Sequence, residues 1–439
     1  MAAVLPPGGL LPFSMETGIL KKQRRAKESH MKKFFRALIK GSCIAALTLA
    51  AVLGTACAAG FFEQFRSEIL TSSVEVPHAR VIVPQSAQEN EEKAEGEEAE
   101  EEEKTEGTEE AEETGEAEGT GQAENGEDKE TVSLLFAGDL FLTDLLQDKY
   151  RQKGIEAAAS AELLDVTKDA DIFMLNQEFP FGTTGEAAED KQYTFRIDPS
   201  YVSVLNELGA DIVTLANNHM LDFGRGPLTE TLELLDREGI SHVGAGENLE
   251  EAKRLQTFQE GDKTIGILGA TRVIPEYSWT ASAHSSGLFS TYDPKLLLEE
   301  IGKAKESCDF VVVYVHWGIE KSTEPEEYQR TLAHQYIDAG ADAVIGAHPH
   351  VLQGVEYYSG KPVFYSLGNF IFSNSSYQTM LVRLLLQEEG IAIEAVPCVS
   401  EANQMRLLEP EKRQDFYREL EALSENAAVD EDGRITEKE

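Results

Sequence analysis

Short apolar runs alternate with amphipathic stretches from residue 131 onward. The first run, TVSLLFAG, is continuously apolar and ends in glycine, as expected of a strand buried on both faces. Similar runs predict further strands at 172–175, 212–215, 264–268, 310–315, 343–345 and 363–366. Between them, helical periodicity occurs at 157–164, 199–208, 227–238, 294–305 and 325–339. This alternation predicts an α/β domain with largely parallel strand pairing that extends to about residue 375.

The remaining part of the chain has a different pattern. Two apolar segments, 380–386 and 391–399, flank Glu389 and Gly390 and predict a β-hairpin. A helix is expected at 409–423, followed by a polar tail. We therefore assign 131–400 to the main domain and 401–439 to a C-terminal helix and tail.

The N-terminal part of the chain predicts a membrane segment. Residues 1–40 are basic, and the 22 residues of 41–62 carry no charge, which is enough to cross a hydrocarbon core of about 30 Å as a helix. Basic residues before this segment place the N-terminus in the cytoplasm and the main domain outside the cell. An uncleaved single-pass anchor is favoured, while a cleaved signal peptide or a lipidated Cys57 stays open; each of the three exports the domain.

Residues 63–130 form a stalk and an acidic linker. From Glu89 to Glu130 there are 21 acidic residues and 3 lysines, in a chain with a formal net charge of −40. Such a segment buries too little apolar surface to offset its ordering entropy, so we expect disorder. The strongly acidic balance also argues against nucleic acid as a partner, because phosphate binding requires basic surface.

Several common kinds of site are unsupported by the sequence. The four cysteines form no CxxC pair, and Cys308 and Cys398 of the main domain are expected to be buried free thiols. A phosphate-binding GxGxxG or GxxxxGK[ST] loop is missing, as is the GxSxG turn of serine hydrolases.

Polar residues with metal-binding chemistry follow the predicted strands instead. Four of the nine histidines come directly after strands, together with two carboxylates and the segment LANNHMLDFG. In an open α/β sheet, ligands bind at the carboxyl ends of strands. The candidate site residues at these ends are Asp139, Glu178, Asn218, His219, Asp222, His316, His348 and His350. His219 could act as an acid, a base or a metal ligand, and Asp222 could orient its imidazole.

Each of these residues also has a structural interpretation. Asp139 could be a turn residue, His316 a packed core histidine, and the segment around His219 a helix cap with a surface imidazole. The pair His348-Pro-His350 is the sharper signal because the proline constrains the separation of two imidazoles. Imidazoles, carboxylates and an amide that recur at strand ends predict one or two divalent ions, with Mn, Fe or Zn as candidates.

The chain from 131 to 375 resembles the CapA-type capsule synthesis family, which is linked to poly-γ-glutamate production. The resemblance is carried by FAGDLFL, LNQEFP, FRIDPSYVSVLNELGADIVTLANNHMLDFG, HVGAGENLEEA, VVVYVHWGIE, GAHPHVLQG and YSLGNFIF. That family is similar to the calcineurin-like metallophosphoesterases, which implies a four-layer α/β/β/α sandwich. It also implies an anionic polymer and other capsule synthesis proteins as partners, and a membrane anchor.

The resemblance implies a role for each residue of the site. Asp139 and His350 would bind the first metal, Glu178 would bridge, and Asn218, His316 and His348 would bind the second. His219 would act as the acid toward a leaving group. The metallophosphoesterase pattern D-x-H reads Asp139-Leu140-Phe141 here, so the first metal would lack one imidazole.

Three functions are therefore open. The chain could bind or process the polymer, act as a metal-dependent hydrolase of phosphoesters or amides at the envelope, or guide the polymer as a catalytically silent scaffold. Arg196, Lys321 and Arg383 are candidates for contact with an anionic polymer.

Overall fold

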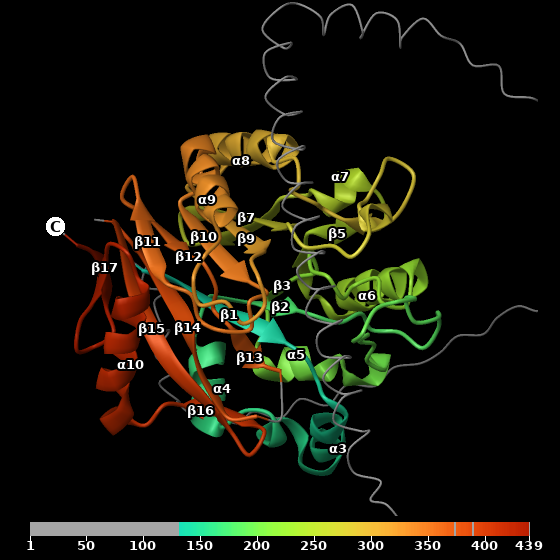
Figure 1. Ribbon diagram of the computed structural model, residues 1–439, viewed down its shortest axis with the longest axis horizontal. Helices are drawn as coiled ribbons and strands as arrows, with labels where there is room; N and C mark the ends of the chain where they lie inside the picture. The colour runs from blue at the N-terminus through green and yellow to red at the C-terminus, as the bar shows by residue number, and fades with distance from the viewer. Residues whose placement is uncertain (1–130, 373–374, 389, 439) are drawn as a thin grey trace, which may run out of the picture. The chain divides into compact units, whose positions relative to one another are not determined.

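The computed structural model describes residues 131–372, 375–388 and 390–438 (Figure 1). The predicted basic segment 1–40, membrane segment 41–62 and linker 63–130 lie outside the described residues. None of the helices within the described part of the chain combines the length and apolar character needed to span a membrane.

Among the described residues, the first sheet has eight strands. Their order is β16-β15-β14-β1-β2-β3-β4, and β13 pairs with β1. The bounds are β1 Val132–Leu140, β2 Ile172–Gln177, β3 Ile212–Thr214, β4 Ser241–Val243, β13 Asn369–Ile371, β14 Tyr377–Gln387, β15 Gly390–Glu401 and β16 Gln404–Leu407. Strands β1 to β4 run parallel to one another, whereas β14 pairs antiparallel with β1.

The second sheet has six strands within the same described ranges, in the order β11-β12-β10-β9-β7-β6. The bounds are β6 Gln256–Glu260, β7 Lys263–Thr271, β9 Phe310–His316, β10 Ala343–Ala347, β11 Val355–Tyr358 and β12 Lys361–Phe364. Strands β7, β9, β10 and β12 are parallel. Two small antiparallel pairs join β5 Ala245–Gly246 to β8 Gly287–Leu288 and β17 Ala427–Val429 to β18 Ile435–Glu437.

Helices cover the outer faces of both sheets. Helices α3 Asp144–Lys153, α4 Ala161–Lys168, α5 Ser203–Leu208 and α6 Arg225–Glu238 pack on the first sheet. Helices α7 Leu249–Ala252, α8 Lys295–Ser307 and α9 Glu327–Ala339 pack on the second. Three short 3-10 helices, η1 Gly154–Ala157, η2 Pro199–Tyr201 and η3 Tyr277–Trp279, lie in the connections, and α10 Pro410–Leu423 follows β16.

The alternation of side chains along β1 explains this layering. Leu134 and Phe136 pack between the two sheets, while Leu135 and Ala137 face the helices of the first sheet. Successive residues of a strand point to opposite faces, so a continuously apolar strand must be covered on both sides. The described residues thus form four layers, helices on sheet on sheet on helices.

The strands and the parallel pairing predicted from the apolar runs are confirmed, and three details differ. The helix expected at 199–208 is instead η2 followed by α5. The helix expected at 157–164 is instead η1 followed by α4, because the Ser160 hydroxyl accepts a hydrogen bond from Leu163 N at 3.3 Å and starts a new helix there. The expected polar tail is wrong. Residues Ala427 and Ile435 of the β17–β18 pair are buried, and Ala395 N donates to Gly433 O at 2.9 Å, so this segment packs on β15.

Candidate metal centre

The polar residues that follow the parallel strands meet at one edge of the two sheets. Asp139 ends β1 and Glu178 follows β2 in the first sheet, while His316 ends β9 and His348 follows β10 in the second. Asp139, Glu178 and His316 are fully buried, and His348 is 5% exposed. The parallel strands of both sheets end at this edge, so residues far apart in the sequence come together here.

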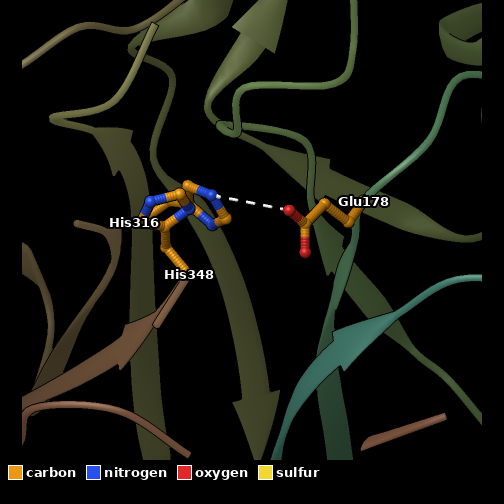
Figure 2. A group of neighbouring side chains, drawn as sticks. All are labelled: Glu178, His316 and His348. Carbon is orange, nitrogen blue, oxygen red and sulfur yellow. Dashed lines mark ion pairs between the residues drawn. The ribbon is translucent and has the colours of Figure 1, made fainter. Parts of the chain in front are cut away.

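Two groups of side chains share Glu178. In the first group, ligand atoms of Asp139, Glu178 and His350 lie within 4.8 Å of one another. In the second group, ligand atoms of Glu178, His316 and His348 lie within the same distance of one another. The Glu178 Oε1 atom is 3.8 Å from His316 Nε2 and 3.9 Å from His350 Nε2. Figure 2 shows the Glu178 carboxylate facing the imidazoles of His316 and His348. One carboxylate thus stands between two sets of possible ligands.

Several atoms of this cluster have unused bonding capacity. Within the described residues, Glu178 Oε1, Glu178 Oε2 and His348 Nδ1 are buried and have no hydrogen-bond partner. Buried polar atoms are normally hydrogen-bonded, and leaving them unpaired costs free energy. Two carboxylate oxygens and an imidazole nitrogen that face one another fit a divalent cation as their common partner.

Burial sets the charge of these groups. Burial, reinforced by the nearby Asp139 carboxylate, raises the pKa of Glu178 well above its usual value. Burial lowers the pKa of His316 well below the usual value and lowers the pKa of His348 to about 3. Both imidazoles are therefore neutral near pH 7, the form that binds metal. His348 and His350 also have positive φ angles of 99° and 58°, a strained backbone found at functional sites.

The segment LANNHMLDFG forms the turn after β3 and completes the cluster. Asn218 Oδ1 lies 2.9 Å from His316 Nε2, beside the second group. His219 Nδ1 lies 2.7 Å from Asp222 Oδ2, and His219 Nε2 faces Glu178 Oε1 at 3.9 Å. Asn217 holds the turn in place, since its amide donates to Gln177 O at 2.8 Å and its Oδ1 accepts from His219 N at 3.1 Å.

All eight residues predicted from the sequence therefore lie at one edge of the sheets. The structure brings together Asp139, Glu178, Asn218, His219, Asp222, His316, His348 and His350. Their assignment to metal binding or catalysis stays a prediction. The prediction that Cys308 and Cys398 are buried free thiols is confirmed.

Lys191 is a member of this region that the sequence did not indicate. Its Nζ donates to Asn218 O at 2.5 Å, forms an ion pair with Asp222 and lies 5.3 Å from the centre of the Trp279 ring. From the same loop, Phe195 stacks on His219 with ring centres 4.0 Å apart. The loop between β2 and α5 has no hydrophobic period, so the sequence contains no signal for these contacts.

Phe141 lies two residues after Asp139 and directly follows β1. Its ring is half-buried and stacks on Phe195 at 3.9 Å between ring centres, within 5.6 Å of the Phe372 ring centre. Position 141 thus contributes aromatic packing beside the cluster. The first group contains His350 as its one imidazole among the described ligand candidates.

Comparison with known proteins now assigns the chain to a class. The family model described as bacterial capsule synthesis protein PGA_cap matches residues 133–374, so the chain belongs to this family. The resemblance to CapA-type proteins inferred from the motifs is confirmed.

Individual relatives agree with this assignment. The PGA biosynthesis protein CapA of Bacillus subtilis is 31% identical over 315 residues, which cover 70% of this chain and 82% of that protein. The capsule biosynthesis protein CapA of Bacillus anthracis is 34% identical over 216 residues, or 47% of this chain and 52% of that protein. A probable polyglutamine synthesis accessory protein of Mycobacterium tuberculosis is 32% identical over 211 residues, or 46% of this chain and 55% of that protein.

Solved structures are more distant. A hypothetical protein from Thermus thermophilus has a TM-score of 0.39 and 18% identity, over 61% of this chain and 98% of that one. The Thermus thermophilus sulfate thiohydrolase SoxB has a TM-score of 0.33 and 16% identity, over 64% of this chain and 46% of that one.

Proposed function

We propose that this chain is a component of capsule or poly-γ-glutamate biosynthesis that binds or processes the anionic polymer through a divalent-metal site. The proposal is supported by membership of the capsule synthesis family and by relatives named for poly-γ-glutamate and capsule biosynthesis. We further propose that the four layers are those of a metallophosphoesterase-like sandwich.

The main observation in support of a metal site is the burial of Glu178 without hydrogen-bond partners among the described residues. Its side chain is fully buried, and within the described residues both of its oxygens lack a hydrogen-bond partner. A buried carboxylate without a partner is strongly unfavourable, and a cation between the two ligand groups removes that cost. The core alone gives no reason for a carboxylate at this position.

The ligand sets follow from the two groups. Glu178, His316 and His348 with the Asn218 amide oxygen would hold one ion, and Asp139, Glu178 and His350 would hold the other. Mixed oxygen and nitrogen ligands suit Mn, Fe or Zn. A bound ion supplies Lewis-acid polarisation of a phosphoryl or acyl oxygen and lowers the pKa of a bound water.

A second candidate function is a metal-dependent envelope hydrolase acting on phosphoesters or amides. It is favoured by the His219–Asp222 pair. The 2.7 Å contact to Asp222 holds the Nδ1 side of the ring and directs Nε2 toward Glu178. Burial lowers the pKa of His219, so the neutral ring would first accept a proton at Nε2 and then give it to a leaving group. Lys191 forms an ion pair with the other oxygen of Asp222, and its Nζ lies 3.1 Å from His219 Nδ1.

The proposal also includes the location of the protein and its partners. We propose a single-pass membrane protein with segment 41–62 as anchor, the main domain outside the cell, and contacts with other capsule synthesis proteins. Of the three basic residues considered for polymer contact, Lys321 is best placed. Lys321 is exposed, and its backbone N–H donates to the carbonyl oxygen of Pro349, the residue between His348 and His350. Arg196 instead lies over the Phe223 ring, 4.0 Å from its centre, and donates to Gly185 O.

Metal analysis of the full chain, purified in detergent, tests the proposal. We expect bound Mn, Fe or Zn in the wild type and its loss in Glu178→Gln and His348→Ala. His284→Ala is the matched control, since His284 is exposed and its backbone N–H donates to the hydroxyl of Ser282. Absence of bound metal in the wild type, also after titration with each ion, would contradict the proposal.

Activity on a generic phosphodiester distinguishes the two functions. Turnover that requires both metal and His219 would support the hydrolase. Stoichiometric metal without turnover would support polymer binding. A wild type without metal would leave the scaffold function.

A further inference from the structure

Asn369 is a buried amide next to Asp139 that the proposed ligand sets do not include. Strand β13 runs parallel to β1, and the paired positions are Asp139 and Asn369. Asp139 N donates to Gly368 O at 3.0 Å, which fixes this register at the site. Asn369 is 6% exposed. Two segments far apart in the sequence thus place a carboxamide beside the carboxylate of the first ligand group.

The contacts of the His350 ring define what this amide does. His350 Nδ1 lies 2.9 Å from Asn369 Oδ1 and 3.1 Å from Asp139 Oδ2, while Nε2 faces Glu178 Oε1 at 3.9 Å. Both neighbours of Nδ1 are acceptor oxygens, so Nδ1 must carry the hydrogen. Nε2 is then the nitrogen with the free lone pair, and it is directed at the shared carboxylate.

We propose that Asn369 is a positioning residue of the metal site, which holds His350 in the tautomer and orientation that present Nε2 to an ion bound by Asp139 and Glu178. This inference rests on the proposed metal site and extends it to a residue outside the ligand sets. Histidines that bind metal commonly donate their other ring N–H to a fixed oxygen, which determines the tautomer and increases ligand basicity.

Two features make this role important here. His350 is the one imidazole in the first group of described ligand candidates, and the nearby position 141 is a phenylalanine that stacks on Phe195. The backbone of His350 has a φ of 58°, which is unfavourable for a residue other than glycine. Contacts of the His350 side chain are therefore needed to hold the ring in this orientation.

The choice of an amide over a carboxylate also has a physical reason. Asp139 and Glu178 already place two carboxylates in this buried region. A third negative charge would increase their repulsion in the absence of metal, whereas the amide oxygen accepts the same hydrogen bond without a charge.

Titration of the full chain with Mn²⁺, by calorimetry and by metal analysis after dialysis, tests the inference. In the wild type we expect two ions. Asn369→Leu, which removes the acceptor, should weaken one of them by about 10- to 100-fold and leave the other within a few-fold. Asn369→Asp keeps an acceptor oxygen, so it should bind with near wild-type affinity the ion that Asn369→Leu weakens. His350→Ala should remove the same ion, and adding Asn369→Leu to it should cause no further loss.

The outcomes separate this inference from the proposed function. Asn369→Leu with both ions bound as in the wild type would overturn it, as would Asn369→Asp behaving like Asn369→Leu. Equal weakening of both ions would show that Asn369 only supports the fold. The wild type could bind a single ion that is still bound in His350→Ala. That result would overturn this inference, whereas the proposed metal site at Glu178 would stand. A wild type without any ion would contradict the proposed function itself.

Discussion

The carboxylates at the two ends of the parallel strands have opposite bonding states. At the amino ends, an aspartate directly precedes each of β2, β3, β9 and β10 and accepts a hydrogen bond from a backbone N–H of the neighbouring strand. These pairs are Asp171 with Ser133, Asp211 with Phe173, Asp309 with Thr264 and Asp342 with Val311, at 2.8 to 2.9 Å. At the carboxyl ends, Glu178 is just as close to strands but both of its oxygens lack hydrogen-bond partners in the described residues.

This difference separates structural carboxylates from candidate ligands. Asp342 shows the structural case most clearly, since it also accepts from Lys305 and Lys361 at 2.7 Å each. Its charge is balanced by partners that belong to the chain. Glu178 has no such partner within the described residues, and burial keeps His316 and His348 of its cluster neutral. Residue type alone therefore does not identify the site; the missing partners do.

The largest expected effect comes from Glu178→Gln. This change removes the carboxylate shared by both ligand groups, so we expect both ions to be lost in metal analysis. Because a buried carboxyl group without a hydrogen-bond partner destabilises the metal-free fold, the metal-free variant should unfold at the same or a higher temperature than the metal-free wild type. A clear fall in unfolding temperature would mean that Glu178 is structural, as Asp342 is.

A second prediction concerns pH. Burial lowers the pKa of His348 from 6.5 to about 3 in the folded chain. As the pH falls below 6.5, the unfolded chain binds a proton that folded His348 does not. The metal-free wild type should therefore lose up to about 1.4 kcal/mol per pH unit relative to His348→Gln, in the window from 6.5 toward 3. Urea unfolding of both proteins between pH 7.5 and 5 measures this difference, and parallel curves would contradict it.

The smallest expected effect is at the amino ends. Asp342→Ala removes the acceptor of the buried Val311 N–H, so we expect a loss of about 2 kcal/mol in the free energy of unfolding, measured with urea. Metal content should be unchanged, since this residue lies at the opposite ends of the strands. Asp262→Ala is the control, because the Asp262 side chain is 93% exposed and should change stability little. Loss of bound metal in Asp342→Ala would remove the distinction between the two ends.

Much of the fold was predictable from local patterns. Continuously apolar segments such as the one in β1 identify strands covered on both faces, and their order identifies parallel pairing. The division into two sheets was expected only through the family resemblance, because the apolar runs do not show which strands are neighbours. The β17–β18 pair was missed since its sequence is mostly polar and its pairing with β15 depends on contacts between distant segments.

The residues of the site also divide into those that local sequence patterns indicate and those that depend on contacts between distant segments. The ligand candidates were predictable because Asp139, Glu178, His316 and His348 each follow an apolar strand. Lys191 was not, since it reaches Asp222 from a loop without periodicity. Asn369 also follows an apolar run, yet its role depends on the β1–β13 register and on which nitrogen of His350 it contacts. Distances of this kind are properties of the folded chain alone.

The measurement that tests the central claim most directly is anomalous X-ray diffraction from crystals of the protein grown with Mn²⁺. We predict a strong anomalous peak within bonding distance of the Glu178 carboxylate, between the His316–His348 pair and the Asp139–His350 pair. A well-ordered Glu178 without an anomalous peak beside it would contradict the account.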